Sequence, residues 1–138
     1  IGQIGYHPDG RIFSSDEGRM VAAMGDDIFH VGDVGTTSYN DMMRADTVRA
    51  LVLAGTNDSQ PGCVSCTYKM YCGQQPEYNY KTQGTIFGRM VDSVWCKKHK
   101  NIFDHLMTKV HQADPEEMAI FERWTTNRRM DHFVQDTE

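Results

Sequence analysis

Three of the chain's four cysteines lie within ten positions, and their spacing constrains the fold more than any other sequence feature. Cys63, Cys66, Cys72 and Cys96 form the pattern C-x2-C-x5-C-x23-C, which leaves no cysteine over. A C-x2-C pair directs two thiolates from one tight turn toward a single metal centre. The distant cysteine then completes a four-sulfur shell. This ligand set suits either tetrahedral zinc or an iron–sulfur cluster.

Other uses of these cysteines are less favourable. Disulfides are disfavoured because the chain does not open with a secretory signal, so a reducing cytosol is the default compartment. A hydrolase that pairs a cysteine nucleophile with His99, His105 or His111 is disfavoured because no oxyanion-type motif accompanies the cysteines. We therefore predict no catalytic residue and a metal site made of Cys63, Cys66, Cys72 and Cys96.

His99 offers zinc a second ligand set. The stretch "CKKH" makes Cys96 and His99 another x2 pair, so Cys63, Cys66, Cys96 and His99 form a Cys3His site. That choice leaves Cys72 unused. If all four sulfurs bind the metal, His99 remains to hydrogen-bond a sulfur or to serve a structural role.

Length and charge exclude several classes. With 138 residues the chain is long enough for one domain with a modest core. Its net charge of −5 argues against binding to a nucleic-acid backbone, and it has no 18-residue apolar run that would span a membrane. We expect a cytoplasmic location. Because the sequence begins with Ile1, we also expect it to be a piece of a longer protein.

The periodicities predict a small α+β fold. We expect a β-hairpin over residues 4–15 that turns at Pro8-Asp9-Gly10, and a further extended segment over 26–34. Residues 38–55 predict two short helices, with Ser38 and Asp46 as N-caps and Gly55 as the stop. The cysteine knuckle spans 61–99, and residues 78–90 are predicted to be irregular or weakly helical.

The C-terminal part predicts a helical hairpin. In "KNIFDHLMTKVHQ" and "DPEEMAIFERWTTNRR", Asp114 is the expected cap of the second helix and Pro115 stands in its first turn. Apolar residues recur at helical spacing, and we expect them to pack. They are Ile102, Phe103, Leu106 and Val110 in the first helix and Ile120, Phe121 and Trp124 in the second.

The cysteines and their surroundings resemble the SPASM domain, the auxiliary-cluster region of radical SAM enzymes that modify peptides and proteins. The knuckle, "HPDGRIFSS" and "FHVGDVGTTSYNDMMRADTVRAL" carry this resemblance. The stretch "CTYKMYCGQQPEYNYKTQGTIFGRMVDSVWCKKHKNIFDHL" is similar to the B-component maturase of the His-Xaa-Ser peptide-modification system. The likeness covers about residues 4–112, so we expect a SPASM-like domain over 1–112 and a C-terminal helix and tail over 113–138.

The resemblance implies one auxiliary [4Fe-4S] cluster on the four cysteines. The family's second cluster takes cysteines where this chain has Ser14 or Ser15 and the stretch "GQQP", with Gln74, Gln75 and Pro76. The C-x3-C-x2-C motif that binds the S-adenosylmethionine cluster is absent from this sequence, so the chain should not be catalytic alone. The implied partners are the radical SAM barrel of the same polypeptide, a precursor peptide and a partner maturase. Zn2+ in a structural peptide- or protein-binding module is the alternative.

Residues around the knuckle carry weaker expectations. Four tyrosines, Tyr68, Tyr71, Tyr78 and Tyr80, are expected to shield the metal from water, with peptide docking as the other role. The acidic residues Asp16, Glu17, Asp26 and Asp27 are expected to form a solvated surface.

Overall fold

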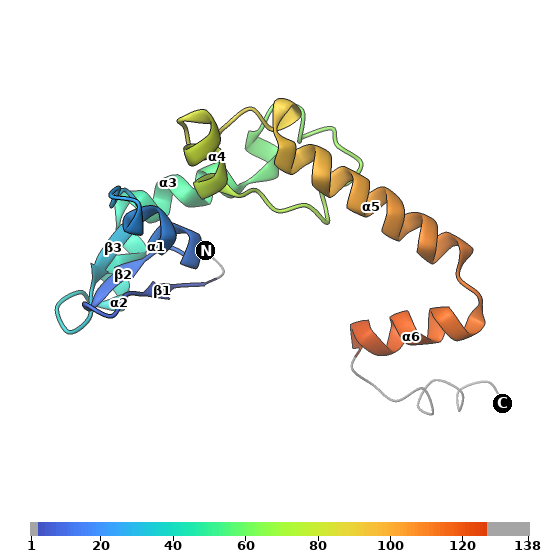
Figure 1. Cartoon of the computed structure of the whole chain (residues 1–138), viewed down its shortest axis with the longest axis horizontal. Coiled ribbons are helices and arrows are strands. Elements are labelled where there is room, and N and C mark those ends of the chain that lie inside the picture. Colours follow the sequence, from blue (N-terminus) through green and yellow to red (C-terminus); the bar gives the residue numbers. More distant parts are fainter. Residues whose placement is uncertain (1–2, 127–138) are drawn as a thin grey trace. The chain divides into compact units, whose positions relative to one another are not determined.

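A computed structural model of the chain describes residues 3–126, which fall into two compact units (Figure 1). The first unit is Ile1–Lys97 and holds the described strands together with all four cysteines. The second is Lys98–Glu138 and holds most of α5 and all of α6. The helices and strands are β1 (Gly5–Tyr6), β2 (Arg11–Phe13), α1 (Asp16–Ala23), β3 (His30–Asp33), α2 (Tyr39–Arg44), α3 (Asp46–Gly55), η1 (Asn57–Ser59), α4 (Pro76–Gln83), η2 (Met90–Asp92), α5 (Val94–Gln112) and α6 (Pro115–Thr126).

The strands form one antiparallel sheet in the order β1-β2-β3, so the predicted α+β class is correct. Tyr6 pairs with Ile12 across the first two strands, and Ile12 pairs with Gly32 across the second and third. The turn between β1 and β2 places Gly10 at a φ of 95°, a conformation that residues with a Cβ rarely adopt. The predicted extended segment over 26–34 contains β3.

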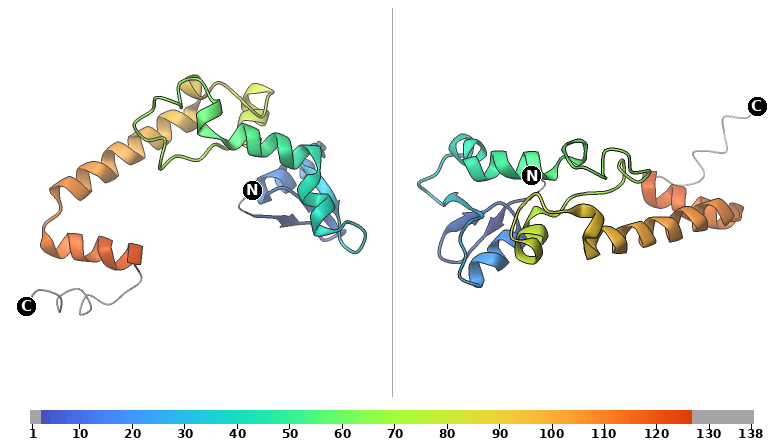
Figure 2. Two further views of the ribbon diagram at one scale, coloured as in Figure 1. Left: turned by 180° about the vertical axis from the view of Figure 1, so that it is seen from behind. Right: turned by 90° about the horizontal axis from the view of Figure 1, so that it is seen from above.

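The core of the first unit consists of two apolar clusters. In the first, Ile12 and Val31 of the sheet pack against Met42 of α2 and Val48 of α3. The second joins Val21 of α1, Phe29 and Leu51 of α3, with Tyr80 of α4 packed against them. This second cluster explains why α4 lies beside α1 although more than fifty residues separate them in the sequence (Figure 2).

Two helices form where none was clearly predicted. The N-cap of α1 is Ser15, whose hydroxyl accepts a hydrogen bond from the Gly18 N–H at 2.9 Å, and Asp16 and Glu17 in the first turn suit the helix dipole. The region predicted to be irregular or weakly helical, residues 78–90, contributes most of α4. This helix begins at Pro76 and ends at Gln83, and Gly84 after it has the left-handed conformation.

The capping predictions had mixed outcomes. Ser38 caps α2 as expected and accepts from the Asp41 N–H at 3.2 Å. Asp46 is not a cap: α3 incorporates it as its first residue, and Ala45 at the cap position has no side chain that can accept a hydrogen bond. The helix does end at the predicted Gly55. Asp114 caps α6, since its Oδ1 accepts from the N–H groups of Glu116 and Glu117, both at 2.9 Å.

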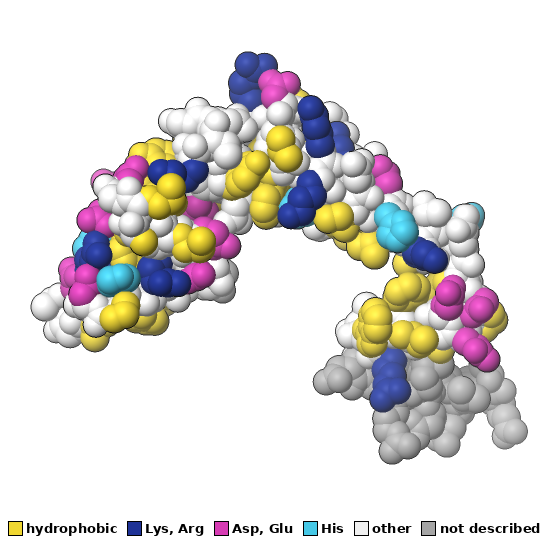
Figure 3. All heavy atoms as spheres, viewed as in Figure 1, with side chains coloured by type: hydrophobic (Ala, Val, Ile, Leu, Met, Phe, Trp, Pro, Cys, Tyr) yellow, Lys and Arg dark blue, Asp and Glu magenta, His cyan; other side chains and the backbone are white. Residues whose placement is uncertain are grey.

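The helices α5 and α6 have no buried residue, and apolar side chains lie at the surface along both of them (Figure 3). Ile102, Leu106 and Val110 of α5 are 41–47% exposed, and Ile120 and Trp124 of α6 are 49% and 74% exposed. The predicted packing of these faces is therefore not seen among the described residues. The last part of the predicted second helix, 127–129, lies outside them. No helix within residues 3–126 has both the length and the apolar character needed to cross a membrane.

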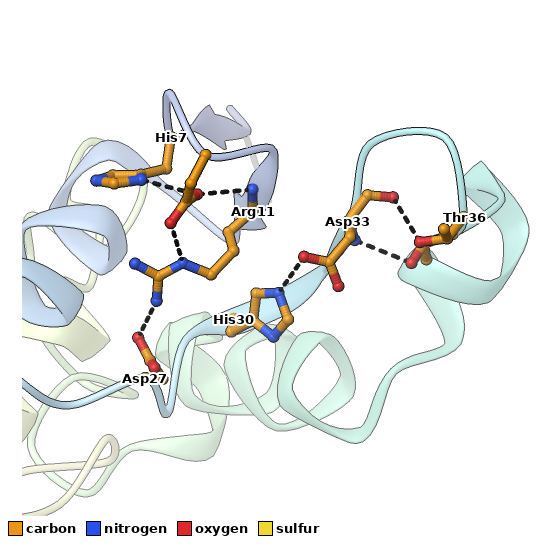
Figure 4. Close-up of polar contacts among 8 residues, drawn as sticks. His7, Arg11, Asp27, His30, Asp33 and Thr36 are labelled. Atoms are coloured by element: carbon orange, nitrogen blue, oxygen red, sulfur yellow. Dashed lines mark hydrogen bonds and ion pairs between the residues drawn. The ribbon is translucent and has the colours of Figure 1, made fainter.

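A polar network lies beside the sheet (Figure 4). The Arg11 guanidinium forms ion pairs with Asp9 at 2.8 Å and with Asp27 at 2.7 Å, and His7 Nδ1 lies 2.8 Å from Asp9. The backbone N–H of Arg11 also donates to the Asp9 carboxylate, which holds the pKa of Asp9 well below its usual range. Asp27 was expected to be solvated; its carboxylate is exposed but paired.

Candidate metal centre

Residues 61–73, hereafter the cysteine segment, form a series of turns between buried Gln60 and α4. None of its thirteen residues is buried, and Cys63, Cys66 and Cys72 are each half-buried. A chain segment without apolar burial gains little from the hydrophobic effect, which supplies most of the stability of a packed region. Other interactions must therefore hold this segment in place.

The backbone of the cysteine segment folds into two successive tight turns. The Cys66 N–H donates to the Cys63 carbonyl at 3.0 Å, and the Cys72 N–H donates to the Tyr68 carbonyl at 3.0 Å. The C-x2-C spacing predicts that Cys63 and Cys66 face one metal from such a turn, and this part of the prediction is not tested by the backbone hydrogen bonds alone.

Cys96 comes from the first turn of α5. The Ser93 hydroxyl accepts from the Trp95 N–H at 3.2 Å at the start of that helix. The Trp95 indole N–H donates to the carbonyl of Gly73 at 3.2 Å, and the Trp95 ring centroid lies 5.7 Å from that of Tyr78. These contacts attach the residue before Cys96 to the residue after Cys72.

Asn57, which precedes the cysteine segment, forms hydrogen bonds with residues at the end of that segment. Its side-chain amide donates to the Lys69 carbonyl at 3.0 Å and to the Cys72 carbonyl at 2.6 Å. Its Oδ1 accepts from the Gln74 amide at 2.9 Å. The neighbouring Asp58 forms an ion pair with Lys69 at 2.7 Å, so η1 holds the second half of the cysteine segment from one side.

Gln74 contacts a predicted ligand directly. Its Nε2 donates to the Cys63 sulfur at 3.2 Å, an N–H···S hydrogen bond of the type that tunes metal-bound thiolates. The Oε1 atom of the same amide is buried without a hydrogen-bond partner among residues 3–126. Gln74 therefore faces the Cys63 sulfur with its amide N–H group and not with its carbonyl oxygen.

The four cysteines are free thiols in the described structure. Within residues 3–126, no three His, Cys, Asp or Glu side chains are grouped closely enough to hold a metal ion. The donors fit the metals by chemistry, since thiolates bind both zinc and iron–sulfur clusters. His99 belongs to the second unit, where its ring lies 6.2 Å from that of Phe103. The four-cysteine site remains a prediction.

The tyrosines have different surroundings. Tyr80 belongs to the core: its ring packs edge-to-face on Phe29 at 5.5 Å, and its hydroxyl donates to Asp26 at 2.7 Å. This hydrogen bond lowers the pKa of Asp26 and raises the pKa of Tyr80. Asp26 is thus part of the packing between α4 and the loop after α1, and not simply a solvated acid. Tyr71, within the cysteine segment, is 64% exposed.

The positions where the SPASM resemblance implies further cysteines lie around one cavity. Ser14, Ser15, Gln74, Gln75 and Pro76 all line a space of about 430 Å³ in the first unit. Their hydroxyl and amide groups are oxygen and nitrogen donors, which suit an iron–sulfur cluster poorly. None of the four cysteines lines this cavity, but Gln74 connects the two, because it lines the cavity and donates to Cys63.

Asn57, Gln74 and Glu77 were not singled out as functional residues from the sequence. Asn57 stood in a turn-rich stretch, where asparagine is common for reasons of backbone conformation alone. Gln74 contacts Cys63 eleven residues away, and Glu77 contacts Ser15 sixty-two residues away. Local spacing carries no signal for such contacts.

Comparison of the chain with protein-family models, with curated proteins and with solved structures found no match.

Proposed function

We propose that this chain is the auxiliary-cluster domain of a radical SAM enzyme that modifies a ribosomally made peptide. Cys63, Cys66, Cys72 and Cys96 are the proposed ligands of one [4Fe-4S] cluster. The radical SAM barrel would belong to the same polypeptide, and the precursor peptide would be its substrate. The proposal places the enzyme in the cytoplasm.

The cysteine segment is the observation that carries the proposal. It holds three half-buried cysteines in tight turns, yet none of its residues is buried. Metal binding would supply the missing stability, because in small metal-dependent modules the binding free energy is also folding free energy. The Trp95–Gly73 hydrogen bond supports the choice of Cys96 as the fourth ligand, since it brings the start of α5 to the end of the segment.

The contact between Gln74 and Cys63 further supports a metal-bound thiolate. An amide N–H aimed at sulfur is a weak interaction for a neutral thiol and a stronger one for a thiolate. Asn57 orients the same amide through its Oδ1. Outer partners of this kind fix ligand orientation and adjust the reduction potential of a cluster.

The proposed role is electron relay or structural support. An auxiliary cluster supplies a one-electron redox centre. With four protein sulfurs as ligands, no iron is left open for a substrate atom. The chain's own residues would bind the cluster, shield it partly from water and present it to the barrel.

Metal analysis after anaerobic purification tests the proposal. We expect about four iron and four sulfide per chain, with a brown colour from sulfur-to-iron charge transfer. Cys72→Ala should lose most of this iron, whereas Met70→Ala, a change of an 83%-exposed side chain in the same segment, should keep it. Iron content that is equal in the wild type and Cys72→Ala would contradict the four-cysteine site.

Zinc is the alternative outcome of the same measurement. A colourless protein with about one zinc per chain that depends on Cys72 would indicate a structural zinc module. Zinc that survives Cys72→Ala but is lost in His99→Ala would indicate the Cys3His set. A chain that binds neither metal would reject both functions.

A further inference from the structure

The cavity next to the sheet contains a buried carboxylate that no basic side chain accompanies. Its volume is about 430 Å³, within the range typical of sites for small ligands. The polar residues that line it are Gln3, Ser14, Ser15, Glu17, Gln74, Gln75 and Glu77. No lysine, arginine or histidine of the described residues lines it.

Glu77 is the most buried charged group of this cavity, with only 6% of its surface exposed. The Ser15 hydroxyl donates to Glu77 Oε1 at 2.6 Å, and the Ser14 hydroxyl lies 3.5 Å from the same oxygen. The hydrogen bonds found for the Glu77 carboxylate within residues 3–126 are these two to Oε1, and no ion pair of Glu77 is found there. A buried carboxylate without an opposite charge is costly, so a cation that enters the cavity would be stabilised.

Ser15 is held in place independently of any ligand. Its oxygen accepts from the Gly18 N–H at 2.9 Å as the N-cap of α1, and this leaves its proton for Glu77. Glu17, in the next turn of the chain, adds a second carboxylate to the wall of the cavity. Ser15 and Glu77 are therefore held in place, and the exposed Glu17 makes the polar part of the cavity more negative.

The remaining walls are apolar. Leu51 of α3 and Pro76 of α4 line the cavity, and Gly55 leaves open space beside them, because a Cβ at that position would meet no atom within 4 Å. A ligand with an alkyl stem and a positively charged tip matches a cavity with one apolar side and one negatively charged side. Lysine and arginine side chains have that form, with apolar stems that pack against apolar surfaces.

The hydrogen bonding of Glu77 favours an ammonium group over a guanidinium. A guanidinium binds a carboxylate best through two parallel hydrogen bonds, one to each oxygen. Here the serine hydroxyls already occupy Oε1, which leaves Oε2 as a single acceptor. A compact ammonium requires only such a point of contact.

We propose that the cavity between β2, α1, α3 and the start of α4 binds the protonated side chain of a lysine in a peptide ligand, with Glu77 as the counter-ion. None of the four cysteines lines this cavity, although Gln74 both lines it and donates to Cys63, and the proposal does not rest on the proposed metal. If the chain does act on a peptide, the cavity gives it a preference for a basic residue.

Titration of the full chain with Nα-acetyl-lysine amide, followed by amide chemical shifts, tests the site. We expect shifts in Ser15, Gly18, Leu51 and Glu77. The norleucine analogue, which has the stem without the charge, should bind roughly tenfold more weakly or worse, because Glu77 would remain unpaired. The arginine analogue should bind more weakly than the lysine one. Equal binding of lysine and norleucine, or no binding of lysine, would overturn the proposal.

Two variants localise the binding. Glu77→Gln keeps an acceptor for Ser15 and removes the charge, so lysine binding should fall roughly tenfold or more while the fold is kept. Gly55→Met should block the cavity from a position with free space, which provides a test if Glu77→Gln is unstable. Glu122→Gln removes an exposed carboxylate of α6 and should bind like the wild type. Unchanged binding in a folded Glu77→Gln or Gly55→Met chain would contradict the assignment.

Discussion

The packed part of the first unit and the cysteine segment lie in one compact unit but are held together differently. In the packed part, apolar side chains of two strands and four helices form two buried clusters, and Phe13 and Phe29 are 0% and 1% exposed. In the cysteine segment no residue is buried. The contacts there include those of Asn57 and Gln74 and the Lys69–Asp58 ion pair.

The difference shows where a metal would matter for stability. Apolar burial contributes about 25 cal/mol per Å², so the packed part gains most of its stability without a ligand. Hydrogen bonds contribute only about 0.5–1.5 kcal/mol each, and exposed ion pairs contribute less. Contacts of this size are small beside the entropy of ordering thirteen residues, at about 1–2 kcal/mol per residue. If the segment binds the proposed metal, we infer that its order depends on that metal and that the packed part does not.

The largest expected effect is in the packed part. Phe29→Ala should lower the free energy of unfolding by about 3–5 kcal/mol, because it leaves a cavity among Val21, Leu51 and Tyr80. Urea unfolding monitored by circular dichroism measures this change. Met70→Ala in the cysteine segment should change it by less than about 0.5 kcal/mol. Similar losses in the two variants would contradict the contrast between the regions.

The second effect concerns the link between the regions. Asn57→Ala should cost about 1–2 kcal/mol, because it removes the donors to the Lys69 and Cys72 carbonyls. Amide hydrogen exchange should speed up at Lys69–Gly73 more than in β2. Asn101→Ala, at an exposed position in α5, is the matched control. Unchanged exchange in the cysteine segment would show that Asn57 does not hold it.

The outcome for Asn57 bears on what the sequence alone can predict. Cysteine spacing is a local pattern, so it predicted the four candidate ligands without the fold. Capping by Ser38 and Asp114 is equally local. The helix α1 was missed although Ser15, Asp16 and Glu17 were all start signals, because a helix of eight residues is marginal alone and depends on tertiary packing. Val21 supplies that packing against Phe29 and Leu51.

The contacts that support the candidate site could not be predicted from the sequence, because they too depend on tertiary packing. Eight mostly polar residues of α4 have no clear apolar face, and the helix is held through Tyr80 on Phe29. Gln74 was noted only as a departure from the family pattern. Its position near Cys63 follows from where α4 packs, and that depends on residues more than fifty positions earlier.

A smaller effect should follow from the hydrogen bond to Cys63. Gln74→Glu removes the N–H donor, so the bound metal should be lost to a chelator about tenfold faster, as is common for outer partners of ligands. The rate of colour loss or zinc release gives the measurement. Gln75→Glu adds the same charge at the next position, where no side-chain hydrogen bond to a cysteine is found among the described residues, and serves as the control. Equal rates in the two variants would assign the effect to charge alone.

The smallest effect is expected in the polar network around Arg11. Because the pKa of Asp9 is held below its usual value of about 3.9, its ionised form stabilises the fold above that pH. This contribution should be lost as the pH falls below about 4. In Asp9→Asn the drop in melting temperature on acidification should be smaller than in the wild type. Glu122→Gln, in α6, should follow the wild-type curve, and a curve for Asp9→Asn that also follows it would show that the pair contributes nothing.

Amide hydrogen exchange with and without bound metal tests the central claim most directly. After complete removal of the metal by a chelator, we predict that protection is lost at Cys66 and Cys72, whose N–H groups close the two turns, and is kept at β2 and α3. Restoring iron and sulfide, or zinc, should restore it. Protection at Cys66 and Cys72 that is unchanged by metal removal would contradict the claim that a metal holds the cysteine segment.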